Sequence, residues 1–158
     1  MERIPMSREG YEKLRAALAR MESVEMIAMA KRIAAARDLG DLSENAEYHA
    51  AREDQGMLVA RIEELKSRLA HAFIVDPASV KSDEVAFGAL VKVIDIELDE
   101  EECFHLVGPG DEDYDKNKIL VSSPIGQALL GKKVGDQVEV QIPVGKIRFK
   151  ITAISFAG

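Results

Sequence analysis

The first half of the chain carries a helical pattern of apolar residues that stops once, at a short acidic segment, and then resumes. Before that segment the pattern repeats at spacings of three and four residues, which is typical of one face of a long helix, and Ser7 can cap its start. After it the spacings alternate between four and three, as in a coiled-coil seam. The two stripes predict two helices that pack on each other. Their apolar positions are Tyr11, Leu14, Leu18, Met21, Val24, Ile27 or Ala28, and Ala34 in the first helix, and Leu58, Ile62, Leu65, Leu69 and Ala72 in the second.

The interrupting segment, LGDLSENAEYHAARE at residues 39–53, contains the residues of a tight turn between helices. Gly40 can adopt the left-handed conformation that ends a helix, and Asp41 or Ser43 can cap the next one. Short connections join antiparallel helices. Residues 8–73 are therefore predicted to form a helical hairpin whose arms of roughly 30 residues extend about 45 Å.

The pattern changes near Pro77, where a polar run is followed by short segments rich in β-branched residues. We place a domain boundary there. An N-terminal coiled-coil hairpin is expected at residues 1–76, with its acidic tip near 38–45, and a second domain at 77–158. The predicted fold class is α+β, and the second domain is a small, mostly antiparallel sheet. Its strands are expected within 86–98, 103–107, 118–121, 136–142 and 147–155.

One short helix is predicted inside the second domain, in the segment SSPIGQALLG. Ser123 can cap it, Pro124 suits the first helical position, and Gly131 can end it after two turns. We expect this helix to lie across the sheet.

Composition narrows the classes of function. A net charge of −7 argues against non-specific binding of nucleic acid, which relies on Lys and Arg displacing phosphate counterions.

The single cysteine, Cys103, fits a reducing compartment and is expected to be a buried small hydrophobe. The run Asp99 to Glu102 is expected to be a solvated turn before a strand. A secretion signal and a run of about 18 apolar residues are both lacking, so we expect a cytoplasmic protein that does not enter a membrane. We expect the free protein to be a monomer.

Two interpretations fit the acids of the turn. Asp41 and Glu44 have the spacing of a capping box, in which both side chains satisfy backbone N–H groups at the start of the next helix. Alternatively, the two carboxylates are presented at the end of the hairpin to a Mg²⁺ ion, which prefers oxygen ligands and usually takes one or two carboxylates from a protein. Two acids alone hold such an ion weakly, so the second interpretation requires a partner that supplies the remaining ligands.

Several segments together resemble the bacterial Gre transcript-cleavage factors, a group of transcription elongation factors, and are closer to the GreA type. They are IPM near the start, ARDLGDLSENAEYHAAREDQG at the turn, FGA at the first predicted strand and SSPIGQALLGKKVGD near the end. The resemblance covers essentially the whole chain. It implies a coiled coil that enters the secondary channel of RNA polymerase, and an FKBP-like C-terminal domain that docks at the rim of that channel.

The resemblance also implies a role for the tip. In the family the acids that match Asp41 and Glu44 help to hold the second catalytic Mg²⁺ of a backtracked polymerase, whose own active site then hydrolyses the RNA near its 3′ end. The chain itself is then an activator with no cofactor of its own, and not an enzyme. An alternative is a Gre-related protein that enters the same channel and inhibits or modulates the polymerase without stimulating cleavage.

Further residues are implicated by the same resemblance. Arg37 and Arg52, on the two arms beneath the tip, match a small basic patch that contacts the 3′ portion of backtracked RNA. Tyr48 is expected to pack against the opposite arm. The start of the short helix is implied to lie near the polymerase rim, although Ile125 can equally be packed on the sheet. The docking residues expected there are Ser122, Pro124 and Ile125.

Overall fold

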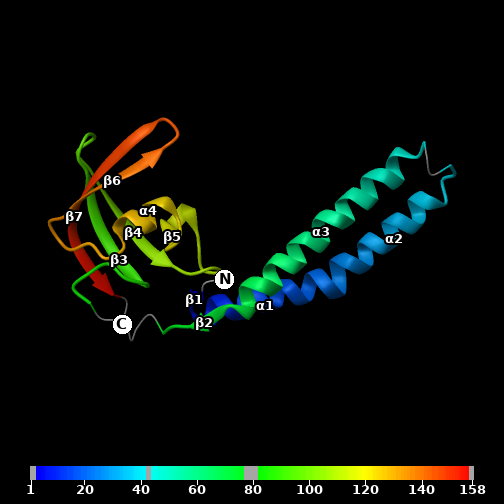
Figure 1. The fold of residues 1–158 in the computed structure, drawn as a ribbon, viewed down its shortest axis with the longest axis horizontal. Coiled ribbons are helices and arrows are strands. Elements are labelled where there is room, and N and C mark those ends of the chain that lie inside the picture. The colour runs from blue at the N-terminus through cyan, green and yellow to red at the C-terminus, as the bar shows by residue number, and fades with distance from the viewer. Residues whose placement is uncertain (1–2, 42–43, 77–81, 157–158) are drawn as a thin grey trace. The chain divides into compact units, whose positions relative to one another are not determined.

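The computed structural model describes residues 3–41, 44–76 and 82–156, and it confirms the α+β class. The chain divides into two compact units (Figure 1). One is the hairpin, Glu12–Ala72, and the other combines Arg3–Tyr11 with the chain from Phe73 onward. Pro77, where we expected the boundary, lies outside the described residues. The part of the chain that the structure describes contains no helix both long and apolar enough to cross a membrane.

The first arm consists of three consecutive helical elements. They are α1 (Arg8–Arg20), a π-helical turn η1 (Met21–Glu25) and α2 (Met26–Arg37). Ser7 caps α1 as predicted, since its Oγ accepts a hydrogen bond from the backbone N–H of Gly10 at 3.0 Å. The helical residues continue to Arg37, so the arm has about the predicted extent.

The π-helical turn changes which face of the first arm is buried. The expected stripe is correct up to Met21, but beyond it Val24 and Ile27 are 54% and 53% exposed, and Ala34 is exposed as well. Ile33 and Ala36 are buried instead. A π-helical turn contains an extra residue, so every later side chain is displaced around the helix axis relative to a regular α-helix. The prediction assumed an unbroken α-helix and was wrong for this part of the stripe.

The second arm is a single helix, α3 (Ala46–Ala70), which runs beside the first (Figure 1). Leu58 and Ile62 are buried, and Leu65 and Leu69 are half-buried, so the predicted seam is confirmed. Exposed ion pairs cross between the arms, from Arg32 to Asp54 at 2.7 Å and from Lys66 to Glu22 at 3.4 Å. The helix ends before residue 73, because Ala72–Ile74 forms strand β2, which pairs with β1 (Ile4–Met6). This two-stranded sheet was not predicted from the sequence.

The second unit contains a five-stranded sheet with the order β5-β4-β3-β7-β6, in which only β4 and β5 are parallel among the described residues. The short helix α4 (Pro124–Leu129) has Ser123 as its cap, as predicted, and contributes Leu129 to the core. The strands are β3 (Ala89–Asp95), β4 (Glu100–Val107), β5 (Lys118–Leu120), β6 (Gln137–Ile142) and β7 (Gly145–Phe156). The core gathers their inward side chains: Ala89, Val91, Val93, Phe104, Leu106, Ile119, Val138, Val140, Phe149 and Ile151.

Strand register corrects two expectations about β4. Cys103 is exposed and not buried, because side chains alternate along a strand and its neighbour Phe104 occupies the inward position. The acidic run is indeed solvated, but only Asp99, with a φ of 52°, belongs to the turn. Glu100–Glu102 are already part of β4 and are exposed there.

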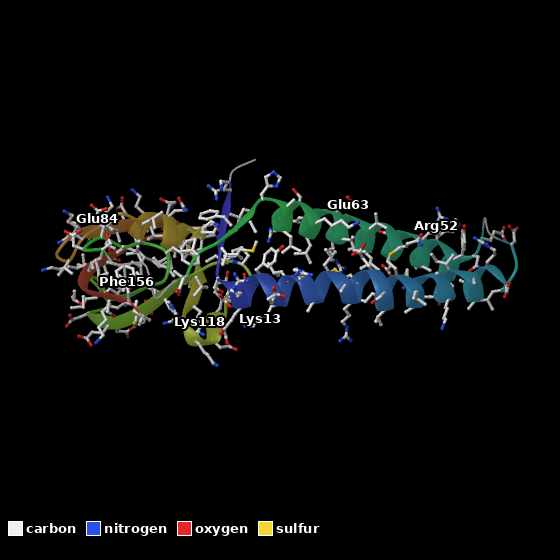
Figure 2. The ribbon with its side chains drawn as sticks, turned by 90° about the horizontal axis from the view of Figure 1, so that it is seen from below. Lys13, Arg52, Glu63, Glu84, Lys118 and Phe156 are labelled. Atoms are coloured by element: carbon white, nitrogen blue, oxygen red, sulfur yellow. The ribbon has the colours of Figure 1, made fainter. Side chains whose placement is uncertain are left out.

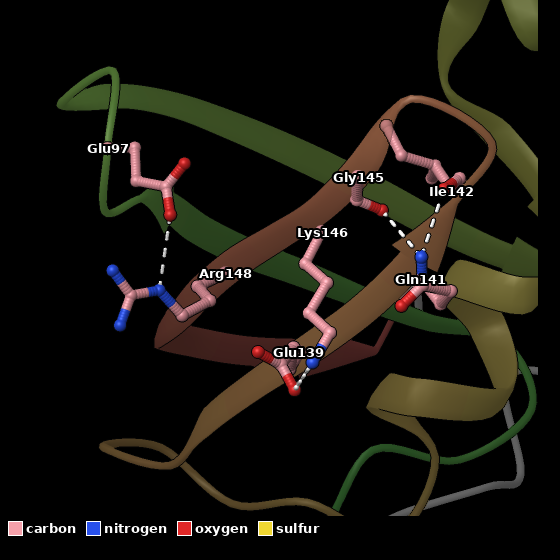
Figure 3. Close-up of polar contacts among 7 residues, drawn as sticks. All are labelled: Glu97, Glu139, Gln141, Ile142, Gly145, Lys146 and Arg148. Carbon is pink, nitrogen blue, oxygen red and sulfur yellow. Dashed lines mark hydrogen bonds and ion pairs between the residues drawn. The ribbon is translucent and has the colours of Figure 1, made fainter.

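The β6–β7 hairpin carries polar side chains on its outer surface (Figure 3). Arg148 contacts Glu97 at 3.2 Å and Lys146 contacts Glu139 at 3.7 Å. Gln141 donates through Nε2 to the carbonyl oxygens of Ile142 and Gly145. These exposed contacts contribute little to stability individually.

The beginning of the chain is packed closely onto the loop that follows β4. The Ser7 hydroxyl donates to a carboxylate oxygen of Asp111. Two glycines face each other beside this bond: a Cβ at Gly110 would overlap the carbonyl oxygen of Gly10, and Gly110 has a φ of +98°. A side chain at either glycine would force these two backbone segments apart.

This packing predicts that Gly110→Ala destabilises the protein more than Gly131→Ala. Both glycines have positive φ, but a Cβ at Gly131 would meet no atom within 4 Å. Gly131→Ala should therefore cost only the backbone strain of about 1–2 kcal/mol, whereas Gly110→Ala adds an overpacking cost of about 1–3 kcal/mol. Urea denaturation followed by circular dichroism measures the difference, and equal losses would contradict the packing argument.

Candidate functional site at the hairpin tip

The turn between the arms lies where the sequence predicted it. α2 ends at Arg37, and the backbone N–H of Asp38 donates to the carbonyl oxygen of Ala34 at 3.2 Å. Gly40 then has a φ of +128°, and a Cβ added there would meet no atom within 4 Å, so its conformation and not crowding favours glycine. The chain is helical again from Ala46.

The helix cap at the tip is Asn45, which was not among the predicted caps. Its Oδ1 accepts a hydrogen bond from the backbone N–H of Tyr48 at 3.0 Å. The capping-box interpretation of Asp41 and Glu44 is therefore wrong, and the alternative cap Ser43 lies outside the described residues. Asn is among the best N-cap residues, and its position directly before AEYHAARE was the signal available in the sequence.

Asp41 and Glu44 are both exposed at the end of the hairpin. Their oxygens match the ligand type that Mg²⁺ prefers, and two carboxylates match the number that such an ion usually takes from a protein. Among residues 3–41, 44–76 and 82–156, no group of three or more His, Cys, Asp or Glu side chains is arranged to hold a metal ion. On their own, two carboxylates would fill only part of the coordination shell of such an ion.

Arg37 and Tyr48 bring the two arms together just beneath the tip. The Cζ atom of the Arg37 guanidinium lies 6.0 Å from the centre of the Tyr48 ring, at the outer limit of a cation–π contact. Tyr48 also meets His49 edge to face, with 5.7 Å between ring centres. Tyr48 therefore lies against the opposite arm, as expected. Arg52 is one turn further along α3 and is exposed (Figure 2).

The three residues expected at a docking surface lie at the start of α4 or just before it, and they differ in exposure. Ser122 and Pro124 are exposed. Ile125 is partly buried and packs against the core of the sheet. Ile125 thus has at least the structural role that we considered as its alternative.

A cavity of about 790 Å³ lies in the second unit and contains none of the residues singled out from the sequence as site residues. Its most distinctive lining group is His105, which is half-buried on β4. Burial lowers the pKa of His105, and the positive charge of Lys118 lowers it further, while Asp111 and a hydrogen bond with the backbone of Gly88 oppose the shift. The imidazole is therefore held in its neutral form to a lower pH than an ordinary histidine.

The pKa shift predicts an acid-sensitive contribution to stability. At neutral pH His105 is uncharged in both the folded and unfolded chain, but below its ordinary value of 6.5 the unfolded chain takes up the proton first. The wild-type protein should lose stability relative to His105→Gln as pH falls through 6.5. Urea midpoints compared between pH 7.5 and 5.5 measure this, and parallel decreases in the two proteins would contradict it.

Comparison with known proteins gives matches along nearly the whole chain. The family model described as transcription elongation factor, N-terminal, matches residues 4–74, and the model for transcription elongation factor, GreA/GreB, C-term, matches residues 80–156. The transcription elongation factor GreA of Thermodesulfovibrio yellowstonii is 52% identical over 155 residues, covering 98% of both chains. GreA of Rhodospirillum rubrum is 44% identical over 156 residues, covering 99% of both. The crystal structure of Thermus aquaticus Gfh1 is 26% identical, covers 98% of this chain and 99% of its own, and superposes with a TM-score of 0.46.

Proposed function

This chain belongs to the GreA/GreB family of transcription elongation factors, and we propose that it rescues backtracked RNA polymerase by stimulating the polymerase to hydrolyse its own transcript. The hairpin enters the secondary channel and brings Asp41 and Glu44 to the polymerase active site. The chain activates this reaction and is not an enzyme by itself. It works in the cytoplasm, where bacterial transcription takes place.

The observation that carries the proposal is the exposed pair of carboxylates at the tip. Because Asn45 caps α3, Asp41 and Glu44 are not required for that task. When bound, Mg²⁺ would stabilise the entering and leaving oxygens of a phosphoryl displacement. Asp41 and Glu44 would supply oxygen ligands to it, and their carboxylates can accept a hydrogen bond from the attacking water and so orient that water toward the RNA.

The other candidate site residues would bind the RNA or the polymerase. Arg37 and Arg52 offer planar, charged donors that suit a phosphate or base edge of the RNA 3′ portion. The exposed Ser122 and Pro124, together with the start of α4 at Ile125, contact the rim of the channel. The inhibitory alternative is not favoured, since the tip keeps both acids.

The double variant Asp41→Asn, Glu44→Gln tests the role of the carboxylates. It should lower transcript cleavage in purified backtracked complexes by roughly 100-fold, because it removes charge that acts at the reacting phosphate. Its melting temperature should remain near that of the wild type, since Asn45 still caps α3. The measurement is the rate at which short 3′ RNA fragments are released.

A matched control removes the same charge beside the tip. Asp38→Asn, Glu47→Gln alters two acids that flank Asp41 and Glu44 in the chain, one at the end of α2 and one in the first turn of α3. This control should keep most of the activity. Full stimulation by the Asp41, Glu44 variant would reject the proposed metal role, and full binding to polymerase without any stimulation by the wild type would favour an inhibitor.

The arginines give a separate prediction. A hydrogen bond to a charged group contributes about 1.5–3 kcal/mol, so Arg37→Gln or Arg52→Gln should reduce cleavage by roughly 10- to 100-fold at a fixed factor concentration. Both variants should also crosslink less to RNA that carries 4-thiouridine at its 3′ end. Arg15→Gln, an exposed arginine in α1, is the control and should change neither reading. Unchanged crosslinking in both tip variants would exclude the RNA contact.

A further inference from the structure

We propose that Asn45 is a positioning residue for cleavage, because its side chain ties the two arms together at the tip. The inference rests on the proposed function and adds a residue to it. Asn45 does not provide a ligand or a charge. It fixes the backbone on which the reacting carboxylates are placed.

Both ends of the Asn45 amide are used. Its Oδ1 accepts from the backbone N–H of Tyr48 on its own arm at 3.0 Å, and its Nδ2 donates to the carbonyl oxygen of Ala36 on the other arm at 2.5 Å. The Ala36 carbonyl belongs to the last turn of α2, where carbonyl groups lack the usual partner four residues later. It also accepts from the backbone N–H of Leu39 at 3.1 Å. One side chain thus satisfies the start of one helix and the end of the other.

Few side chains can make both bonds from this position. A carboxylate at Asn45 would accept from Tyr48 but could not donate to Ala36. A serine would cap α3 about as well, but its side chain is shorter than that of Asn and ends in a single atom. The observed pair of bonds therefore requires an amide of this length.

The two hydrogen bonds of Asn45, which we call the bridge, lie next to the proposed site. The bridge closes the chain between Ala36 and Asn45, and both Asp41 and Glu44 lie within that closed segment, Glu44 immediately before the bridging residue. The contact between Arg37 and Tyr48 spans the same two arms one residue beyond Ala36. Without the bond from Asn45 to the Ala36 carbonyl, the start of α3 would be held less firmly to the end of α2, and small displacements of reacting groups are costly in rate.

The decisive variant is Asn45→Ser, which keeps a helix cap and removes the bond across the arms. With the full-length protein and backtracked complexes of purified RNA polymerase, its maximal cleavage rate should fall by roughly 10-fold or more. The factor concentration for half-maximal stimulation should not change, because the polymerase contacts of α4 are intact. The Mg²⁺ concentration for half-maximal cleavage should rise, which a purely stabilising residue would not cause in a folded protein. Asn45→Ala, which removes the cap too, should show the same loss of rate together with a lower melting temperature.

The outcomes separate this inference from the proposed function. A wild-type protein that fails to stimulate cleavage refutes the proposed function itself. If the wild type stimulates cleavage and the Asn45→Ser variant is equally active, only the positioning role of Asn45 is refuted. The same conclusion follows if the activity lost in the variant is fully recovered by adding more of the variant protein. In the free protein, NMR should show slower solvent exchange for the side-chain amide of Asn45 than for that of Asn117, which is exposed. Equal exchange rates would also overturn the inference.

Discussion

The apolar seam between the two antiparallel arms is the constraint on which the hairpin depends. Most of the stability of a helix in a protein comes from packing its apolar face, so each arm is stabilised by the other. Ile33 and Ala36 on α2 and Leu58 and Ile62 on α3 are the buried residues of this seam, together with Ala51. Small side chains occupy the seam near the tip, and the ion pair between Arg32 and Asp54 lies outside it on the exposed surface. The seam brings the two helix ends within reach of one side chain.

An amide, and not a carboxylate, forms the cap of α3 at the tip. A turn between helices must satisfy carbonyl groups at one helix end and N–H groups at the next. If the carboxylate of Asp41 or Glu44 accepted hydrogen bonds from these N–H groups, its negative charge would be partly neutralised at the start of α3. The neutral Asn45 does this instead, and it also reaches the carbonyl of Ala36. The cap of α3 and the bond between the two arms thus both come from a neutral side chain.

Features that repeat along the chain were predictable from the sequence. Features that depend on contacts with a distant part of the same chain were not. The α3 seam, the five main strands and the cap of α4 by Ser123 follow from local spacing and composition. The π-helical turn changes the buried face by one residue and has no clear local signal, so Val24 and Ile27 were misplaced. Cys103 was misjudged because residue type was considered without strand register. At the tip the turn and its acids were predictable, but several adjacent polar residues could serve as the cap, and only the distance to Ala36 distinguishes Asn45.

The weakness of the tip as a metal site is consistent with the function that we propose. A protein that carried a complete Mg²⁺ site on an exposed hairpin could promote hydrolysis of any RNA that reached it. With two carboxylates, the tip leaves most of the coordination shell of such an ion to water or to another molecule. Under the proposed function, the polymerase would supply the other ligands and present the RNA, which would confine hydrolysis to complexes whose transcript has moved backward. The net charge of −7 acts in the same direction, since it disfavours non-specific binding to free nucleic acid.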